Sequence, residues 1–260
     1  MNKPTRFPIE LPLELGARLR AFTPARVGLG RTGVSQQTRD ILRFQISHAQ
    51  ARDAVHGRLE AATLVATISD IEGALKGGPV LRLHSAAPDR TTYLQRPDLG
   101  RMLDEDSRQC LAQIVPVTCE LALIVADGLS ALAVERHVPA LLEQLLPRLA
   151  APSMAPICVV EQGRVAIGDE IGSAFRARLS VVLIGERPGL SSPDSLGAYI
   201  TWHPRPGRTD AERNCISNIR AEGIGYEEAA EQLSRCLTAA QARQLTGVAL
   251  NDGRRQLNPG

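Results

Sequence analysis

Three largely apolar runs constrain the fold of this 260-residue chain more than any other feature of its sequence. They span residues 119–126, 156–161 and 179–185, and the last is the richest in Val, Leu and Ile. A strand that is apolar at nearly every position is typically buried on both faces, as in a parallel sheet between two layers of helices. We therefore expect these runs to form neighbouring, mostly parallel strands.

Helical patterns separate the apolar runs, at residues 130–149 and 169–178, and another closes the chain at 227–245. A fourth strand is expected at 197–204. Strands that alternate with helices form βαβ units. The predicted fold is therefore of the α/β class, with a Rossmann-like, mainly parallel sheet flanked by helices.

In such a sheet, ligands bind just beyond the carboxyl ends of the strands. Polar residues follow three of the predicted strands directly, as Asp127-Gly128, Gln162-Gly163 and Glu186-Arg187-Pro188-Gly189. These loops are the places where the sequence predicts a binding site.

The first third of the chain has a different pattern. A helix is expected at residues 38–55, capped by Ser35 and ended by Gly57, with an apolar stripe formed by Ile41, Leu42 and residues 44–46. A second helix is expected at 61–75, before the Gly77-Gly78-Pro79 break. We predict two parts: a mainly helical N-terminal region, residues 1–88, and a Rossmann-like α/β domain, residues 89–260.

Composition argues against several classes of protein. The formal net charge is +2 and 3% of residues are aromatic, so neither a strong field nor a base-stacking platform points to nucleic acid. No run of about 18 apolar residues predicts a membrane span, and the first residues do not resemble a secretory signal. The five cysteines include no C-x-x-C pair, which argues against a disulfide framework or a zinc site. A cytosolic protein is expected.

The sequence GLGRTG at residues 28–33 has the spacing of a dinucleotide-binding fingerprint. That fingerprint requires a strand that runs into the first glycine, and here Pro24 interrupts residues 20–27, which contain no apolar run. We expect a turn ahead of a helix instead. No nucleophile elbow, P-loop or metal-ligand spacing occurs, so we expect neither catalytic nor metal-ligating residues in this chain. A nucleotide-dependent oxidoreductase and a non-catalytic scaffold remain as alternatives.

Several loop phrases, taken together, resemble the small subunit of ethanolamine ammonia-lyase over nearly the whole chain. GERPGL (185–190) followed by CISNI (215–219) is the most specific pair. The other phrases are ARVGLGRTG (25–33), YLQRPDLGR (93–101), VADGLSALAVE (125–135) and GRVAIGDEIG (163–172).

This resemblance implies a two-component carbon–nitrogen lyase that uses adenosylcobalamin (coenzyme B12) to convert ethanolamine to acetaldehyde and ammonia by a radical mechanism. The small subunit would form a hetero-oligomer with a large catalytic subunit, a TIM barrel, and cobalamin would lie at their interface. The family also implies a cytoplasmic enzyme within a bacterial microcompartment.

The resemblance also implies which residues contact the cofactor. The cobalamin contacts of the family fall on Val165 in GRV, Glu186 in GERPGL and Cys215 in NCISNI, and Arg164 is a weaker candidate. A carboxylate or a backbone carbonyl accepts hydrogen bonds from the amide groups at the corrin rim. A small, soft Cys and an apolar Val suit the rest of that contact.

Overall fold

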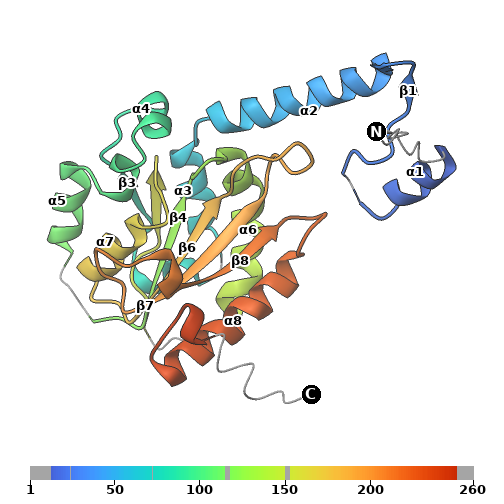
Figure 1. Ribbon diagram of the computed structural model, residues 1–260. Coiled ribbons are helices and arrows are strands. Elements are labelled where there is room, and N and C mark those ends of the chain that lie inside the picture. Colours follow the sequence, from blue (N-terminus) through green and yellow to red (C-terminus); the bar gives the residue numbers. More distant parts are fainter. Residues whose placement is uncertain (1–12, 24, 72, 115–117, 150–152, 251–260) are drawn as a thin grey trace, which may run out of the picture.

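A mixed sheet of six strands forms the centre of the computed structural model, which describes residues 13–23, 25–71, 73–114, 118–149 and 153–250 (Figure 1). The strand order is β3-β5-β4-β6-β7-β8. Their bounds are Leu81–His84 (β3), Leu121–Ala126 (β4), Cys158–Glu161 (β5), Leu179–Gly185 (β6), Leu196–Trp202 (β7) and Arg213–Ile219 (β8).

The three apolar runs form the middle of this sheet as predicted. Strand β4 pairs in parallel with β5 on one side and with β6 on the other, and β3 pairs in parallel with β5. Every residue of β4 and β6 is buried. Strands β7 and β8 continue the sheet in antiparallel pairing. The mainly parallel α/β fold is therefore confirmed.

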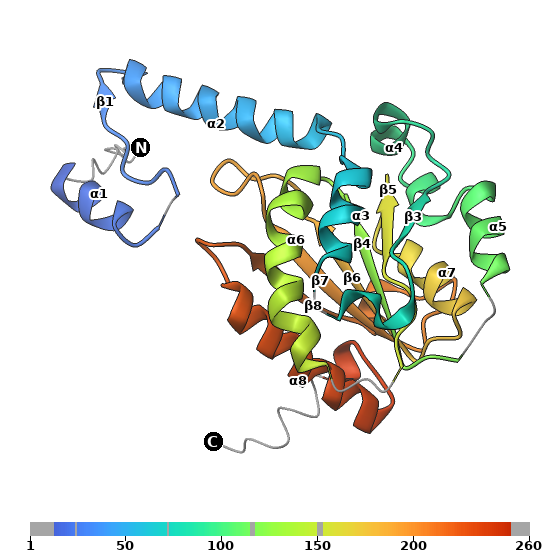
Figure 2. The same cartoon turned by 180° about the vertical axis from the view of Figure 1, so that it is seen from behind.

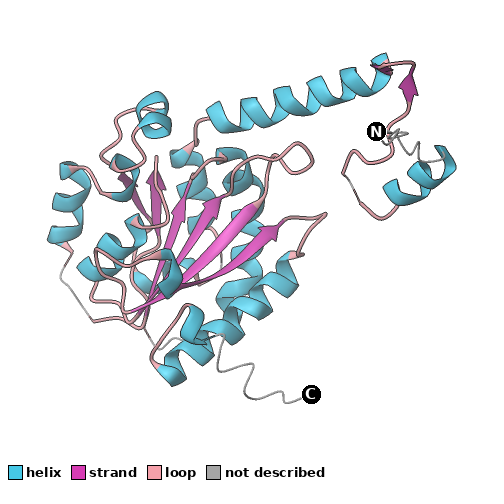
Figure 3. Cartoon of the chain, in the orientation of Figure 1, coloured by secondary structure: helices cyan, strands magenta, loops and turns pink. Residues whose placement is uncertain are grey.

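Helices cover both faces of the sheet, as the two views and the colouring by element type make plain (Figures 2 and 3). Alternate residues of β4 belong to two separate apolar clusters because side chains alternate across a strand. One cluster includes α3 (Ala61–Ser69), α6 (Ala131–Leu145) and α8 (Tyr226–Arg243). The other includes α5 (Glu105–Gln113) and α7 (Ile167–Ala174).

Short elements complete the body. They are α4 (Arg90–Gln95) and four 3-10 turns at Ala74–Gly77, Leu99–Arg101, Leu146–Arg148 and Asp210–Glu212. Helix α4 begins at Asp89, whose carboxylate accepts from the backbone N–H of Thr92. Because β3 lies in the sheet, residues before 88 already belong to its layers. The division of the chain into domains at residue 88 stays a prediction.

An arm precedes the body. It comprises α1 (Leu13–Arg20), a loop, the two-stranded hairpin β1 (Arg31–Thr32) and β2 (Ser35–Gln36), and α2 (Thr38–His56). Helix α2 projects away from the sheet and carries α1 and the hairpin at its far end (Figures 1 and 2). Its last turn meets the body, where Ala54 is buried.

Two expectations for this part of the chain were wrong. Ser35 does not cap α2, because it lies in β2, and Gln37 holds the cap position without a side-chain hydrogen bond. The helix expected at 61–75 ends at Ser69, where the chain turns toward Gly73, and Ala74–Gly77 forms a separate 3-10 turn. Within the described residues, none of the helices has the length and apolarity needed to cross a bilayer.

Candidate functional site

The chain leaves neighbouring strands β4 and β5 toward opposite faces of the sheet. Strand β4 leads into α6 on one face, and β5 leads into α7 on the other. Such a divergence opens a crevice at the carboxyl edge, which is the usual ligand position in an open α/β sheet. Two of the predicted strand-end pairs, at 127–128 and 162–163, meet at this crevice.

Arg90 from α4 fills the crevice. Its Nη1 donates to the Gly128 carbonyl at 2.8 Å and lies 3.4 Å from both Asp127 Oδ2 and Gln162 Oε1. Its Nε donates to the carbonyl of Val55 at 2.7 Å, which attaches the last turn of α2 to the sheet. Arg90 therefore joins the two strand ends to the arm.

Tyr93, one turn further along α4, closes the same space. Its hydroxyl donates to the Gly163 carbonyl at 3.0 Å, and the ring is fully buried. The guanidinium groups of Arg90 and Arg164 lie 4.9 Å and 4.4 Å from the centre of this ring. Such cation–π contacts hold both arginines in place.

The crevice is also closed by the backbone. Asp127 Oδ1 accepts from the Gly163 N–H at 3.0 Å. Gly128 has φ +57°, and a Cβ there would lie 2.3 Å from the Gly185 carbonyl oxygen, so the turn after β4 requires glycine. The usual ligand position of this sheet is thus occupied by the chain's own side chains.

Burial dominates the electrostatics of the crevice. It raises the pKa of Asp127 to about 6, although the Arg90 guanidinium opposes this shift. Burial also lowers the pKa of Arg90 and raises that of Tyr93. Asp127 and Arg90 form a desolvated ion pair, which suits a rigid structural joint.

A second surface begins where β6 ends. Glu186 follows Val182 and Ile184 on the α7 side of the sheet, and its Oε2 accepts from the Ser195 hydroxyl and, at 3.1 Å, from the Asn218 N–H. A Cβ on Gly197 would lie 2.9 Å from Glu186 Oε1. The glycine therefore makes room for the carboxylate to lie across β7.

Cys215 lies on the same side of the sheet as Glu186. It pairs with Tyr199 across β7 and β8, and Tyr199 packs at the edge of the α7-side cluster. Cys215 is solvent-exposed. The residue as a whole is exposed, but neighbouring atoms partly desolvate its thiol and raise the pKa, and the Glu186 carboxylate adds to this shift. The structure therefore brings Glu186, Tyr199 and Cys215 together on one sheet surface.

Val165 lies at the start of α7 and packs partly against the same cluster. Helix α7 is tight on β6, because a Cβ on Gly168 would lie 2.3 Å from Val182 Cγ2. Arg213 of β8 attaches α7 to the sheet, because its guanidinium donates hydrogen bonds of 2.8 Å and 2.6 Å to the Asp169 carboxylate. Val165, Glu186 and Cys215 all face the α7 side, beyond the part of the sheet that α7 covers.

A cavity of about 550 Å³ adjoins this surface, between α2 and the loop after β6. Three arginines and a histidine line it together with apolar residues: His48, Arg52, Arg164 and Arg187. Arg164 Nε is buried and has no hydrogen-bond partner within the described residues. The carboxyl edge therefore presents a carboxylate beside a basic, partly apolar hollow.

GLGRTG has a different structure from a dinucleotide fingerprint. Residues 28–30 are loop, and the hairpin β1–β2 follows them. Gly28 has φ +60°, and a Cβ there would lie 2.4 Å from Gly16 Cα, so the glycines allow the loop to pack on α1. This confirms the expected turn ahead of a helix and leaves the oxidoreductase alternative without a structural basis.

Sequence reasoning missed Arg90, Tyr93 and Ser195 as parts of the carboxyl edge. Arg90 and Tyr93 lie on α4, a helix of six residues that is too short to show a period. Asp89, which caps this helix, and the phrase that begins at Tyr93 were the available signals for it. Ser195 lies in the loop between β6 and β7, where neither periodicity nor a motif identified it.

Comparisons with known proteins identify one family. The family model described as ethanolamine ammonia-lyase light chain (EutC) matches residues 14–251. A protein named ethanolamine ammonia-lyase small subunit from Xanthomonas campestris pv. campestris is 53% identical over 251 residues, covering 94% of this chain and 90% of the relative. One of the same name from Pseudomonas aeruginosa is 55% identical over 239 residues, covering 90% and 86%. A third, from Pseudomonas fluorescens, is 52% identical over 257 residues, covering 97% and 90%.

Proposed function

The chain belongs to the ethanolamine ammonia-lyase light-chain family, and we propose that it binds adenosylcobalamin together with a large subunit that carries the catalytic site. The reaction of that enzyme is the conversion of ethanolamine to acetaldehyde and ammonia. This chain is then one part of a two-subunit ammonia-lyase, and its task is to bind and orient the cofactor.

The half-buried Glu186 carboxylate, on the α7 side of the sheet, is the observation that supports this proposal most directly. Two donors, Ser195 and the Asn218 N–H, fix its orientation. The rim of cobalamin carries amide groups, which donate to a fixed carboxylate. Exposed Cys215 and partly buried Val165 offer less polar contacts on the same side. The residues present therefore fit such a ligand.

The open shape of this surface fits a cofactor shared between two proteins. Glu186 is half-buried and Cys215 is exposed, so a ligand here would stay uncovered on its other side. The closed crevice nearby is filled by Arg90 and Tyr93. A large ligand would thus lie on the surface beyond β6 and need a partner protein to cover it.

Bound adenosylcobalamin supplies the radical chemistry of the reaction. The residues of this chain contribute positioning and exclusion of water. Glu186 would accept hydrogen bonds from amides at the rim, Val165 would form an apolar wall, and Cys215 would contact the ligand as a neutral thiol, because its pKa is raised. We further propose a cytoplasmic enzyme enclosed in a bacterial microcompartment, as the family resemblance implies.

A cofactor titration of the assembled two-subunit enzyme tests the role of Glu186. Glu186→Gln keeps the shape but loses the charge and exchanges one acceptor for a donor. A hydrogen bond to a charged group contributes about 1.5–3 kcal/mol, so the Kd for adenosylcobalamin should rise by roughly one to two powers of ten. The turnover rate at saturating cofactor should change much less, because a remote contact binds ground and transition states alike.

Glu231→Gln is the matched control, since Glu231 is an exposed carboxylate on α8, within the opposite layer of helices. Gel filtration would verify that both variants assemble. Unchanged cofactor affinity in an intact Glu186→Gln enzyme would remove Glu186 from the site. Deamination of ethanolamine by this chain without a large subunit would overturn the proposal that the large subunit carries the catalytic site.

A further inference from the structure

Exposed apolar side chains gather on the arm. Of the eleven large hydrophobic residues that are exposed within the described chain, eight lie between residues 15 and 46. They are Leu15, Leu19, Phe22, Val34, Ile41, Leu42, Phe44 and Ile46, and Phe22 is 88% exposed. Helix α2 buries Asp40 and Ala54 and no larger apolar residue. An apolar surface concentrated in this way is typical of an interaction site.

The same arm is basic. Residues 13–56 contain seven arginines and three acidic residues, Glu14, Asp40 and Asp53, which gives a formal charge of +4. The whole chain has a charge of +2, so the remaining residues together carry −2. Charge is therefore separated between the arm and the rest of the chain, which favours an acidic partner for the arm.

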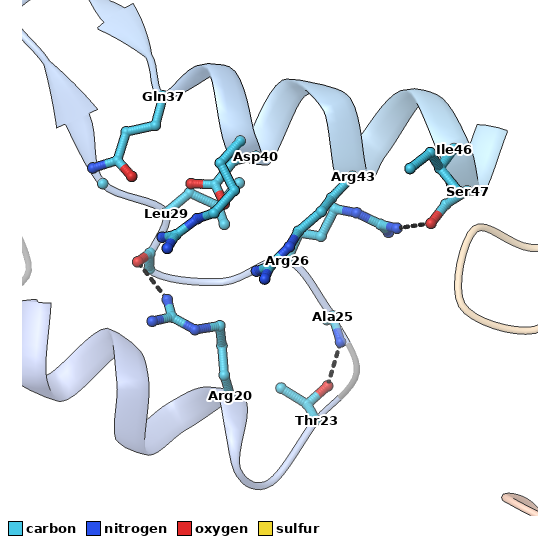
Figure 4. A pocket seen from close by; sticks show the side chains of 13 residues that line it. Arg20, Thr23, Ala25, Arg26, Leu29, Gln37, Asp40, Arg43, Ile46 and Ser47 are labelled. Carbon is cyan, nitrogen blue, oxygen red and sulfur yellow. Dashed lines mark hydrogen bonds and ion pairs between the residues drawn. The ribbon is translucent and has the colours of Figure 1, made fainter.

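A cavity of about 530 Å³ lies within the arm, between α1, the loop at 25–30 and the first half of α2 (Figure 4). Four arginines line it beside a single acidic residue, Asp40: they are Arg20, Arg26, Arg39 and Arg43. The excess of positive charge around one cavity points to an anionic group as its occupant.

Three of these arginines have partners inside the arm. Arg20 donates to the carbonyls of Val27 and Gly28, Arg26 donates to Ser47 Oγ at 2.5 Å, and Arg39 lies 3.8 Å from Asp40. Arg43 forms neither a hydrogen bond nor an ion pair with any residue that the structure describes. Figure 4 shows Arg43 extending from α2 toward the loop, across from Arg20.

We propose that the arm is a docking surface for an acidic, partly apolar surface of the large subunit, with a carboxylate of that subunit entering the cavity beside Arg43. This inference rests on the proposed function for the existence of that partner. The unpaired guanidinium would bind the carboxylate, and the apolar side chains around the cavity would exclude water from the ion pair. Arg20 and Arg26 hold the cavity open by fixing the loop between the helices.

Binding of the full-length chain to the large subunit, measured at about 0.05 M and 0.5 M salt, tests this surface. Arg43→Glu should raise the Kd at least about tenfold at low salt, because it places a like charge against the partner's carboxylate. Salt should weaken the wild-type complex more than the variant complex, since the ion pair is screened. Arg205→Glu is the control, because Arg205 is also exposed but lies in the loop between β7 and β8.

A second variant, Phe22→Ser, removes the most prominent apolar group of α1 and its loop without touching the cavity's charge. It should also weaken assembly, and circular dichroism should show that all three variants keep the fold. Inorganic phosphate is the competing probe: binding of phosphate that is lost in Arg43→Glu, with assembly unchanged, would overturn the proposal in favour of a small-anion site.

The failures of the two proposals are distinguishable. If the wild-type chain did not bind a large subunit at all, the proposed function would fail. If it bound tightly and Arg43→Glu and Phe22→Ser bound equally well, the arm would not be the docking surface, and the proposed function would stand.

Discussion

Helices α2 and α6 show how differently the same kind of sequence is used in the arm and in the body. Helix α2 has 19 residues and buries two of them, whereas α6 has 15 residues and buries eight. Both contain apolar residues at helical spacing. Helix α6 packs on the sheet, beside α8, while the apolar stripe of α2 faces solvent.

Apolar periodicity therefore identifies a helix but does not indicate which surface packs against it. In the body, the pattern is explained by the chain's own sheet. In the arm, the apolar stripe of α2 remains exposed in the described part of the chain. This apolar surface is therefore available to another molecule. Stability should therefore depend on the body and assembly on the arm.

A pair of leucine truncations gives the largest expected contrast. Leu142 of α6 is 0% exposed and Leu42 of α2 is 53% exposed. Leu142→Ala should lower the free energy of unfolding by about 2–5 kcal/mol, because it leaves a cavity in the core. Leu42→Ala should change it by about 0.5 kcal/mol or less. Urea unfolding of the isolated chain measures both free energies. A comparable loss from Leu42→Ala would show that the apolar stripe of α2 also stabilises the fold.

The joint between the two regions should show a distinctive pH dependence. Arg90 binds both Val55 of α2 and the buried carboxylate of Asp127, whose pKa burial raises from 3.8 to about 6. The folded chain therefore holds a proton on Asp127 that the unfolded chain has released. The contribution of Asp127 to stability should fall as the pH rises from about 4 to about 6, by up to about 3 kcal/mol.

The difference in unfolding free energy between wild type and Asp127→Asn, measured from pH 3.5 to 7.5, isolates this contribution. Glu212 is the opposite case, because hydrogen bonds from Thr209 and Arg208 lower its pKa to about 2. The contribution of Glu212 to stability should be lost as the pH falls below about 4.5. The difference in unfolding free energy between wild type and Glu212→Gln should therefore rise with pH, whereas that for Asp127→Asn should fall. If the difference in unfolding free energy between wild type and Asp127→Asn did not change with pH, water would already reach Asp127 in the folded chain.

The sequence predicts the body better than the arm, for a physical reason. Strands β4, β5 and β6 are apolar at nearly every position, because both faces are buried, and that pattern is visible in one dimension. Strand β8 alternates less clearly, since several of its residues are exposed at the edge of the sheet, and no periodicity identified it. Strand β3 has four residues, of which Leu83 alone is fully buried.

The candidate site was predictable in part. Polar residues after buried strands mark the carboxyl edge, so Asp127, Gln162 and Glu186 were found from position alone. The crevice at that edge is filled by Arg90 and Tyr93, and this depends on a long-range contact that no local pattern encodes. The placement of Cys215 beside Tyr199 likewise depends on antiparallel pairing of β7 with β8.

A pair of serine replacements gives the smallest expected effect and separates local from global stability. Ser47 Oγ accepts from Arg26 at 2.5 Å within the arm, and Ser107 Oγ accepts from the His84 N–H at 2.8 Å within the body. Ser107→Ala leaves a half-buried backbone donor without its partner, which should cost about 1–2 kcal/mol of global stability. Ser47→Ala should cost about 1 kcal/mol or less, because water can replace the lost acceptor at a more exposed site.

Native-state hydrogen exchange distinguishes the two outcomes. After Ser47→Ala, amides at residues 25–47 should exchange faster while those of β4 and β6 keep their protection, since the loop loses one of its contacts with α2 and the sheet loses none. After Ser107→Ala, protection should fall throughout the body. If Ser47→Ala lowered protection in β4 and β6 as well, the arm and the body would unfold as one cooperative unit. The arm would then contribute to global stability, and its role could not be limited to assembly with the large subunit.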